Sequence, residues 1–131
     1  MLHIALRMAH AFKLVRERID RVGILLSGLC AVHCVATLVL VAVLGLGGGF
    51  LLDPALHRIG LALAIVVGGI ALGLGLSRHG QREPLMIGGV GLSLMTLALI
   101  TGHSPAEAAL TIAGVALVAL AHWRNVRHLD A

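Results

Sequence analysis

Four long apolar runs separated by short polar segments dominate the chain. They cover about residues 22–46, 59–77, 85–101 and 106–123. Apolar runs of about 17–25 residues can cross the hydrocarbon core of a bilayer as α-helices, and short connections favour antiparallel neighbours. The pattern therefore predicts an all-α integral membrane protein whose four spans form one helix bundle in contact with the lipid bilayer.

The first 21 residues show helical amphipathicity instead of a continuous apolar run. An apolar stripe recurs there at helical spacing, with basic residues largely opposite it: Ile4, Met8, Phe12, Val15 and Ile19. A helix with one apolar and one basic face suits the membrane surface. We therefore expect an amphipathic cytoplasmic-side helix over 1–21, a transmembrane bundle over 22–123 and a polar tail over 124–131.

Local signals mark where the helices begin and end. Glycines cluster after the first run, at 45 and 47–49, and should end the first helix. Asp53 is a good N-cap residue, and the proline after it suits the first helical position. Ser104 and Glu107 have the spacing of a capping box before the fourth run.

Pairs of small residues four positions apart recur in the second and third runs: Ala64 with Gly68, Gly69 with Gly73, and Gly89 with Ser93. Such pairs let helix backbones approach closely in membranes. We expect them to serve packing, either within one chain or between the chains of a homo-oligomer.

The positions of lysine and arginine predict the orientation of the bundle. Of the 10 basic residues, all but Arg58 lie next to the apolar runs at the end that carries both termini. Cytoplasmic segments of membrane proteins carry an excess of Lys and Arg. Both termini are therefore expected in the cytoplasm.

Composition excludes several classes of function. The chain is 59% hydrophobic and only 12% charged, unlike any ordinary water-soluble domain. Its net charge of +4 comes without the stacking aromatics of a nucleic-acid surface, so no nucleic-acid partner is expected. Because the sequence shows no nucleophile–base–acid set, phosphate loop or paired carboxylates, we do not expect an enzyme.

The polar residues of the first span gather on one side of its helix. At 100° per residue, a sector of about 120° contains Ser27, Cys30, His33, Cys34 and Thr37. Polar groups are costly in hydrocarbon, so this stripe should face other helices or a wet cavity. It is the strongest candidate for a functional site.

Two thiols beside an imidazole form a soft ligand set. The side chains of Cys30, His33 and Cys34 are neighbours on one helix face, and thiolates favour soft cations such as Cu(I), Zn and, by the same logic, Hg(II). Helix geometry disfavours a disulfide at this spacing. We expect an open, exchangeable metal site, supported by Ser27 and Thr37, and no tightly bound cofactor.

Polar residues outside the first span are weaker candidates. His57 and His103 should lie at the outer mouth, where they could capture an incoming cation. His122, at the inner end of the fourth run, is expected to be an interfacial anchor more than a ligand. Asp20 is expected to be a feature of a helix N-terminus. Met95 should lie near the depth of the cysteines, more for packing than for ligation.

The first-span pattern resembles that of the MerC-type mercury-resistance membrane proteins. The resemblance rests on the four-span layout, over nearly the whole chain, and on Asp20, Gly23, Ser27, Cys30, His33 and Cys34. It implies a small four-span protein of the bacterial inner membrane that takes up Hg(II), with Cys30 and Cys34 as ligands of the ion. Some members carry a second cysteine pair near the C-terminus, where this chain has His122 and His128 instead.

The leading hypothesis is transport of mercuric ion, or another thiophilic cation such as Zn, Cu or Cd, through an intramembrane Cys-x-x-His-Cys site. Two alternatives stay open. A haem-binding or redox membrane protein would use His33 and a second intramembrane histidine as axial ligands. A structural or regulatory membrane subunit would have no metal site.

Overall fold

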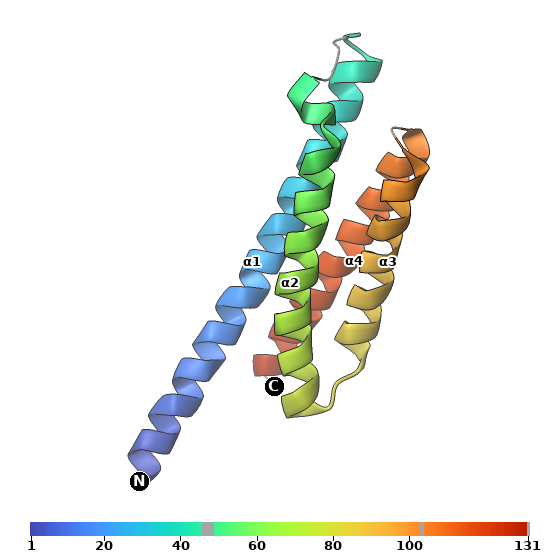
Figure 1. The fold of residues 1–131 in the computed structure, drawn as a ribbon. Helices are drawn as coiled ribbons and strands as arrows, with labels where there is room; N and C mark the ends of the chain where they lie inside the picture. Colours follow the sequence, from blue (N-terminus) through green and yellow to red (C-terminus); the bar gives the residue numbers. More distant parts are fainter. Residues whose placement is uncertain (46–48, 103, 131) are drawn as a thin grey trace.

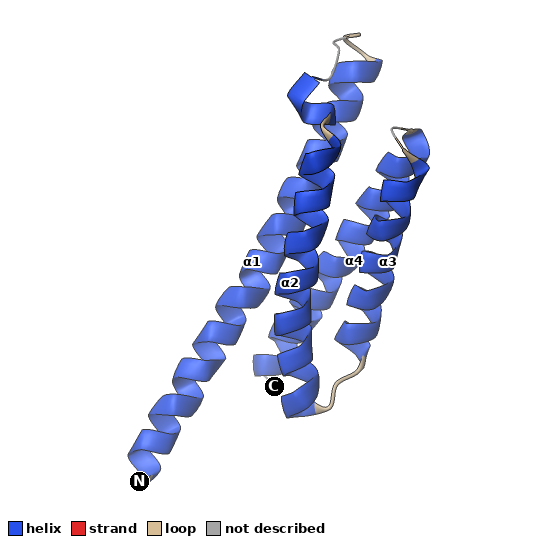
Figure 2. Cartoon of the chain, viewed as in Figure 1, coloured by secondary structure: helices blue, strands red, loops and turns tan. Residues whose placement is uncertain are grey.

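The computed structural model describes residues 1–45, 49–102 and 104–130. Over these residues the chain forms α-helices and one short 3₁₀ helix, and no strand. The elements are α1 (Leu2–Ala42), η1 (Gly49–Leu52), α2 (Pro54–His79), α3 (Glu83–Thr101) and α4 (Pro105–Asp130). Figure 2 shows a short loop between α2 and α3. The prediction of an all-α four-helix bundle is confirmed.

The helices run alternately up and down, and both termini lie at the same end of the bundle (Figure 1). All four are long and apolar enough to cross a membrane. Because the loop between α2 and α3 lies at the end of the termini, the other two connections lie together at the opposite end. The protein is therefore a four-span membrane bundle.

Helix α1 continues without a break from the N-terminal segment into the first span. Its first turns project beyond the other helices (Figure 1), and their large apolar side chains are exposed: Leu2, Ile4, Leu6, Met8 and Phe12. The helix ends at Ala42, whereas the predicted span reaches residue 46, which lies outside the described residues. The boundary between a surface segment and a span within α1 stays a prediction.

The predicted helix starts are confirmed by their hydrogen bonds. The Asp53 carboxylate caps α2, accepting from the Ala55 N–H at 2.9 Å. Ser104 Oγ accepts from the Glu107 N–H at 3.2 Å and satisfies a donor at the start of α4. Helix α2 ends at His79, and the φ of 65° at the next residue, Gly80, is the left-handed conformation that glycine adopts without strain.

Helix α4 is the centre of the bundle, since it packs against α1, α2 and α3. Its closest approach is to α3, where a Cβ on Gly91 would lie 2.6 Å from the Gly114 carbonyl oxygen. Only glycine allows this backbone contact. Next to it lies the apolar core of Leu61, Met95, Val115 and Val118.

Within one chain, the packing role predicted for Gly69, Gly73 and Gly89 is wrong. A Cβ at any of these positions would meet nothing within 4 Å. The close contacts of α3 use Gly88 and Gly91 instead. Gly88 and Gly89 are neighbours in sequence but lie about 100° apart around the helix, so only one of them can face α4.

Candidate metal site

The polar stripe of α1 is turned toward the other helices. Ser27 and Cys34 are buried, with 6% and 5% of their surfaces exposed, and Cys30 is half-buried. On the opposite face of α1, Leu29 and Val32 are exposed. The thiols therefore lie inside the bundle and the aliphatic side chains face the lipid.

Both thiols are free. They come from successive turns of one helix, which brings side chains four residues apart together. Between them in sequence, His33 is half-buried, and its ring centroid lies 5.5 Å from that of His57 on α2. Thr37 Oγ1 donates to the His33 carbonyl oxygen at 2.8 Å, so this hydroxyl is held by its own helix.

Cys34 opens onto a pocket of about 290 Å³ at the end of the bundle away from the termini. Its wall is formed by α1, η1 and the first turns of α2 and α4, and includes Cys34, Thr37, Leu38, Val41, Leu52, His57, Ser104 and Glu107. We call it the outer pocket. Ala42, Pro105 and Ala108 complete the wall, and its polar groups are Cys34, Thr37, His57, Ser104 and Glu107.

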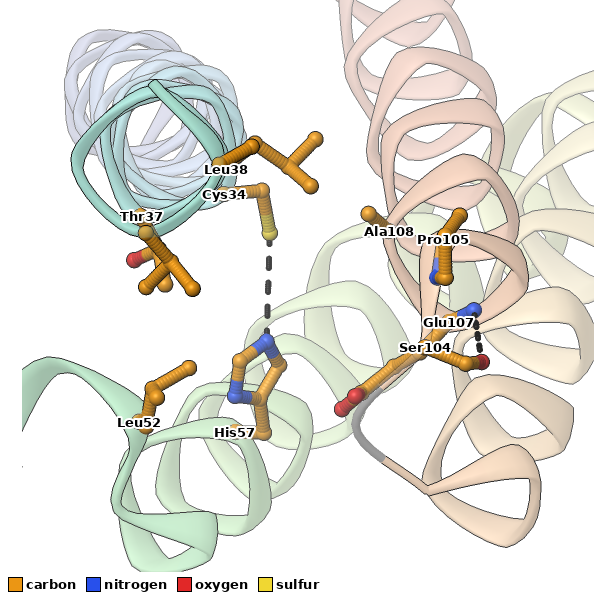
Figure 3. A pocket seen from close by; sticks show the side chains of 11 residues that line it. Cys34, Thr37, Leu38, Leu52, His57, Ser104, Pro105, Glu107 and Ala108 are labelled. Atoms are coloured by element: carbon orange, nitrogen blue, oxygen red, sulfur yellow. Dashed lines mark hydrogen bonds between the residues drawn. The ribbon is translucent and has the colours of Figure 1, made fainter. Parts of the chain in front are cut away.

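Three polar side chains converge on the outer pocket from three helices. Cys34 Sγ lies 3.8 Å from His57 Nε2. Figure 3 shows these two groups pointing toward each other, with the Glu107 carboxylate reaching from α4 into the same space. Glu107 is only 9% exposed. The pocket therefore combines a thiol, an imidazole and a carboxylate, which can attract a cation and place it on sulfur.

Of the two histidines predicted at the outer mouth, His57 lies beside Cys34, and His103 lies outside the described residues. In the described part of the chain, no three His, Cys, Asp or Glu side chains are grouped so that they could hold a metal ion. The arrangement thus offers two adjacent thiols and a nearby imidazole, and no closed structural metal centre. An open set of this kind suits exchange more than storage.

A second polar cluster is fully buried toward the other end of the bundle. The Asp20 carboxylate accepts from His122 Nδ1 at 2.7 Å and from Asn125 Nδ2 at 2.8 Å. The Asn125 amide also donates to the Ala71 carbonyl oxygen at 3.3 Å, so the cluster ties α1, α2 and α4 together. Asp20 and His122 are 0% and 1% exposed.

The roles predicted for His122 and Asp20 are wrong. His122 is in the core and not an interfacial anchor, while its neighbour Trp123 is 45% exposed and stacks under Arg127. Asp20 lies in the middle of α1 and not at a helix start. The reason is the continuity of α1, which carries Asp20 alongside the last turns of α4.

Sequence analysis also missed Glu107 as a pocket residue and Asn125 as a partner of Asp20. In the sequence, the spacing of Glu107 from Ser104 indicates only a capping box. A signal for the second cluster exists, because His122 and Asn125 are three positions apart and therefore share a helix face. Their partner on α1 cannot be found from local spacing, since it is 102 residues away.

Comparison with known proteins identifies a family. Residues 20–127, most of the chain, match the family of the MerC mercury resistance protein. No curated protein and no solved structure matches the chain. The matched range begins at Asp20 and contains the whole polar stripe of α1 and all of α2, α3 and the outer pocket's α4 residues. This chain is a multi-pass membrane protein that belongs to the MerC mercury resistance family.

Proposed function

We propose that this protein takes up mercuric ion, or another soft metal cation, across the bacterial inner membrane through Cys30 and Cys34. Membership of the MerC mercury resistance family supports the choice of ion. The chemistry agrees, because thiolates are the protein ligands that soft cations prefer. In this proposal both termini are cytoplasmic, as the basic residues predict, and the outer pocket opens toward the periplasm.

The observation that carries the proposal is the approach of Cys34 Sγ to His57 Nε2, 3.8 Å, on the wall of the outer pocket. A thiol must lose its proton to bind a metal ion, and His57 is the adjacent base. The Glu107 carboxylate on the facing wall adds negative charge that favours entry of a cation. His57 and Glu107 therefore act in capture, and Cys34 is the first sulfur ligand.

The second thiol lies on the preceding turn of α1, four residues from the first, where helix geometry makes side chains neighbours. An ion on Cys34 can then bond Cys30 before it leaves Cys34, so it never becomes a bare charge in a low-dielectric interior. Mercuric ion suits this step, because it forms stable two-coordinate complexes with thiolates. His33, next to His57, is a further donor at the same depth.

Uptake of radioactive mercuric ion into proteoliposomes tests the proposal. Cys30→Ser and Cys34→Ser should each reduce uptake to the level of empty vesicles, because one sulfur cannot support the transfer. Met86→Leu is the matched control, since it removes a soft but exposed side chain, 69% accessible. Undiminished uptake by the double variant, in which both Cys30 and Cys34 are replaced by serine, would contradict the proposal.

The capture step has its own control pair. His57→Asn should slow uptake at low concentrations of mercuric ion, while His10→Asn, on the exposed N-terminal part of α1, should not. Equal rates for the two variants would remove His57 from the pathway.

A further inference from the structure

A second, smaller cavity lies beyond the cysteine pair, between the outer pocket and the Asp20 cluster. It measures about 40 Å³ and is lined by residues of all four helices. One water occupies ~10–15 Å³ on this measure, so there is room for a single metal ion. Cys34 lines the outer pocket and Cys30 lines this inner cavity. The cysteine pair therefore lies between the outer pocket and the inner cavity.

The inner cavity brings together three soft donors from three helices. Its lining includes Cys30 on α1, Met95 on α3 and His122 on α4, with the Ser27 hydroxyl beside them. Met95 and His122 are 6% and 1% exposed, so neither serves the surface of the protein. Thiolate, thioether and imidazole are all ligands of soft cations. The rest of the lining is aliphatic or glycine.

The hydrogen bond between His122 and Asp20 holds the imidazole ring as metal-ligating histidines are held. Its Nδ1–H donates to Asp20, because a carboxylate can only accept. In the neutral imidazole the lone pair is then on Nε2, and a carboxylate behind the ring is the common partner of a ligating imidazole. Nε2 lies against Gly23, where a Cβ would overlap the ring. Gly23 also lines the cavity, and its missing side chain makes room for the His122 ring itself.

We propose that the inner cavity is a second transit site for the soft cation, with Cys30, Met95 and His122 as its ligands. The order of events rests on the proposed function: the ion reaches Cys30 from Cys34 and then moves inward. The step is a ligand exchange without a change of oxidation state. The bond from the ion to Cys34 breaks as bonds to Met95 Sδ and His122 Nε2 form, and the released thiolate is reprotonated from the outer side.

Transport by two methionine variants tests the site in function. Met95→Leu keeps the volume of the core but removes the thioether, while Met86→Leu removes an exposed thioether of the same helix. Met95→Leu should slow mercuric ion uptake about tenfold or more, with the binding of mercuric ion to the cysteine pair unchanged. Uptake by Met95→Leu equal to that of Met86→Leu would remove Met95 from the site.

Direct detection of the ligand tests the site without transport. Purified Cys34→Ser protein, in which Cys30 is the remaining thiol, is labelled with nitrogen-15 histidine and loaded with an NMR-active isotope of Cd²⁺. Scalar coupling between cadmium and the Nε2 of His122 is expected, and it should vanish in the same protein with Cys30→Ser. Cadmium bound without this coupling, or no cadmium bound, overturns the inner site.

The two experiments separate the two proposals. Coupling to His122 in a protein that does not move mercuric ion would leave the inner site standing and end the proposed function. If uptake depends on the cysteines but the cadmium-loaded protein shows no coupling to His122, the proposed function is supported and the inner site is ruled out.

Discussion

Exchanging the amide and carboxylate of the buried Asp20 cluster gives the sharpest test of how the bundle is held together. The Asp20 carboxylate is 0% exposed and accepts from two donors, His122 Nδ1 and Asn125 Nδ2. Asp20→Asn keeps the shape of the side chain but leaves one acceptor oxygen for two donors. A buried unsatisfied donor costs about 1–3 kcal/mol, so we expect this loss in the free energy of unfolding.

Asn125→Asp should cost more. It places a second carboxylate where Asn125 Nδ2 now lies, 2.8 Å from Asp20 Oδ2, and removes the donor to the Ala71 carbonyl oxygen. An uncompensated buried charge costs about 3–5 kcal/mol. The double variant restores one amide and one carboxylate in exchanged positions. It should therefore be more stable than the sum of the single losses predicts, by about 1–3 kcal/mol.

Unfolding of the four proteins in mixed detergent micelles, followed by far-ultraviolet circular dichroism, measures these energies. Independent sites add within about 0.3–0.5 kcal/mol. Additive losses within that margin would refute the direct contact between Asp20 and Asn125, and with it the alignment of α1 with the last turns of α4.

Three further predictions follow from other parts of the structure. Gly91→Ala should lower the free energy of unfolding by about 1–3 kcal/mol, because the new Cβ overlaps the α4 backbone. Gly89→Ala, with open space around it, should raise the free energy of unfolding by up to ~1 kcal/mol. Equal effects of the two variants in the same detergent titration would contradict the close approach of α3 to α4. Glu107→Gln should raise the mercuric ion concentration needed for half-maximal uptake and leave the maximal rate nearly unchanged, and initial rates showing the reverse would place Glu107 outside capture. Asp53→Ala should cost about 0.5–2 kcal/mol through loss of the α2 cap, seen as a lower Tm, and an unaltered Tm would show that the cap is unimportant.

The parts of the fold that sequence predicts well depend on local properties. Span length and apolar continuity predict four membrane helices, and the caps at Asp53 and Ser104 lie where the spacing places them. The polar stripe of α1 also follows from one helix alone, because helical periodicity fixes which residues share a face. Each of these needs no knowledge of neighbouring helices.

Contacts between helices cannot be predicted from the properties of single helices. Cys34 meets His57 across 23 residues, and Asp20 meets Asn125 across 105. Small residues are frequent in all four helices, so spacing alone does not tell Gly91, which touches α4, from Gly89, which faces outward. Rotation of each helix about its axis decides these contacts, and that rotation is set by packing of the whole bundle.

The proposed transport depends on binding of a soft cation to sulfur inside the membrane bundle, at Cys30 and Cys34. X-ray absorption at the mercury edge, on protein in lipid vesicles loaded with one mercuric ion per chain, tests it most directly. We expect a first shell of two sulfur atoms that disappears when both cysteines are replaced by serine. A first shell of nitrogen and oxygen alone, or a spectrum indifferent to the two substitutions, would contradict it.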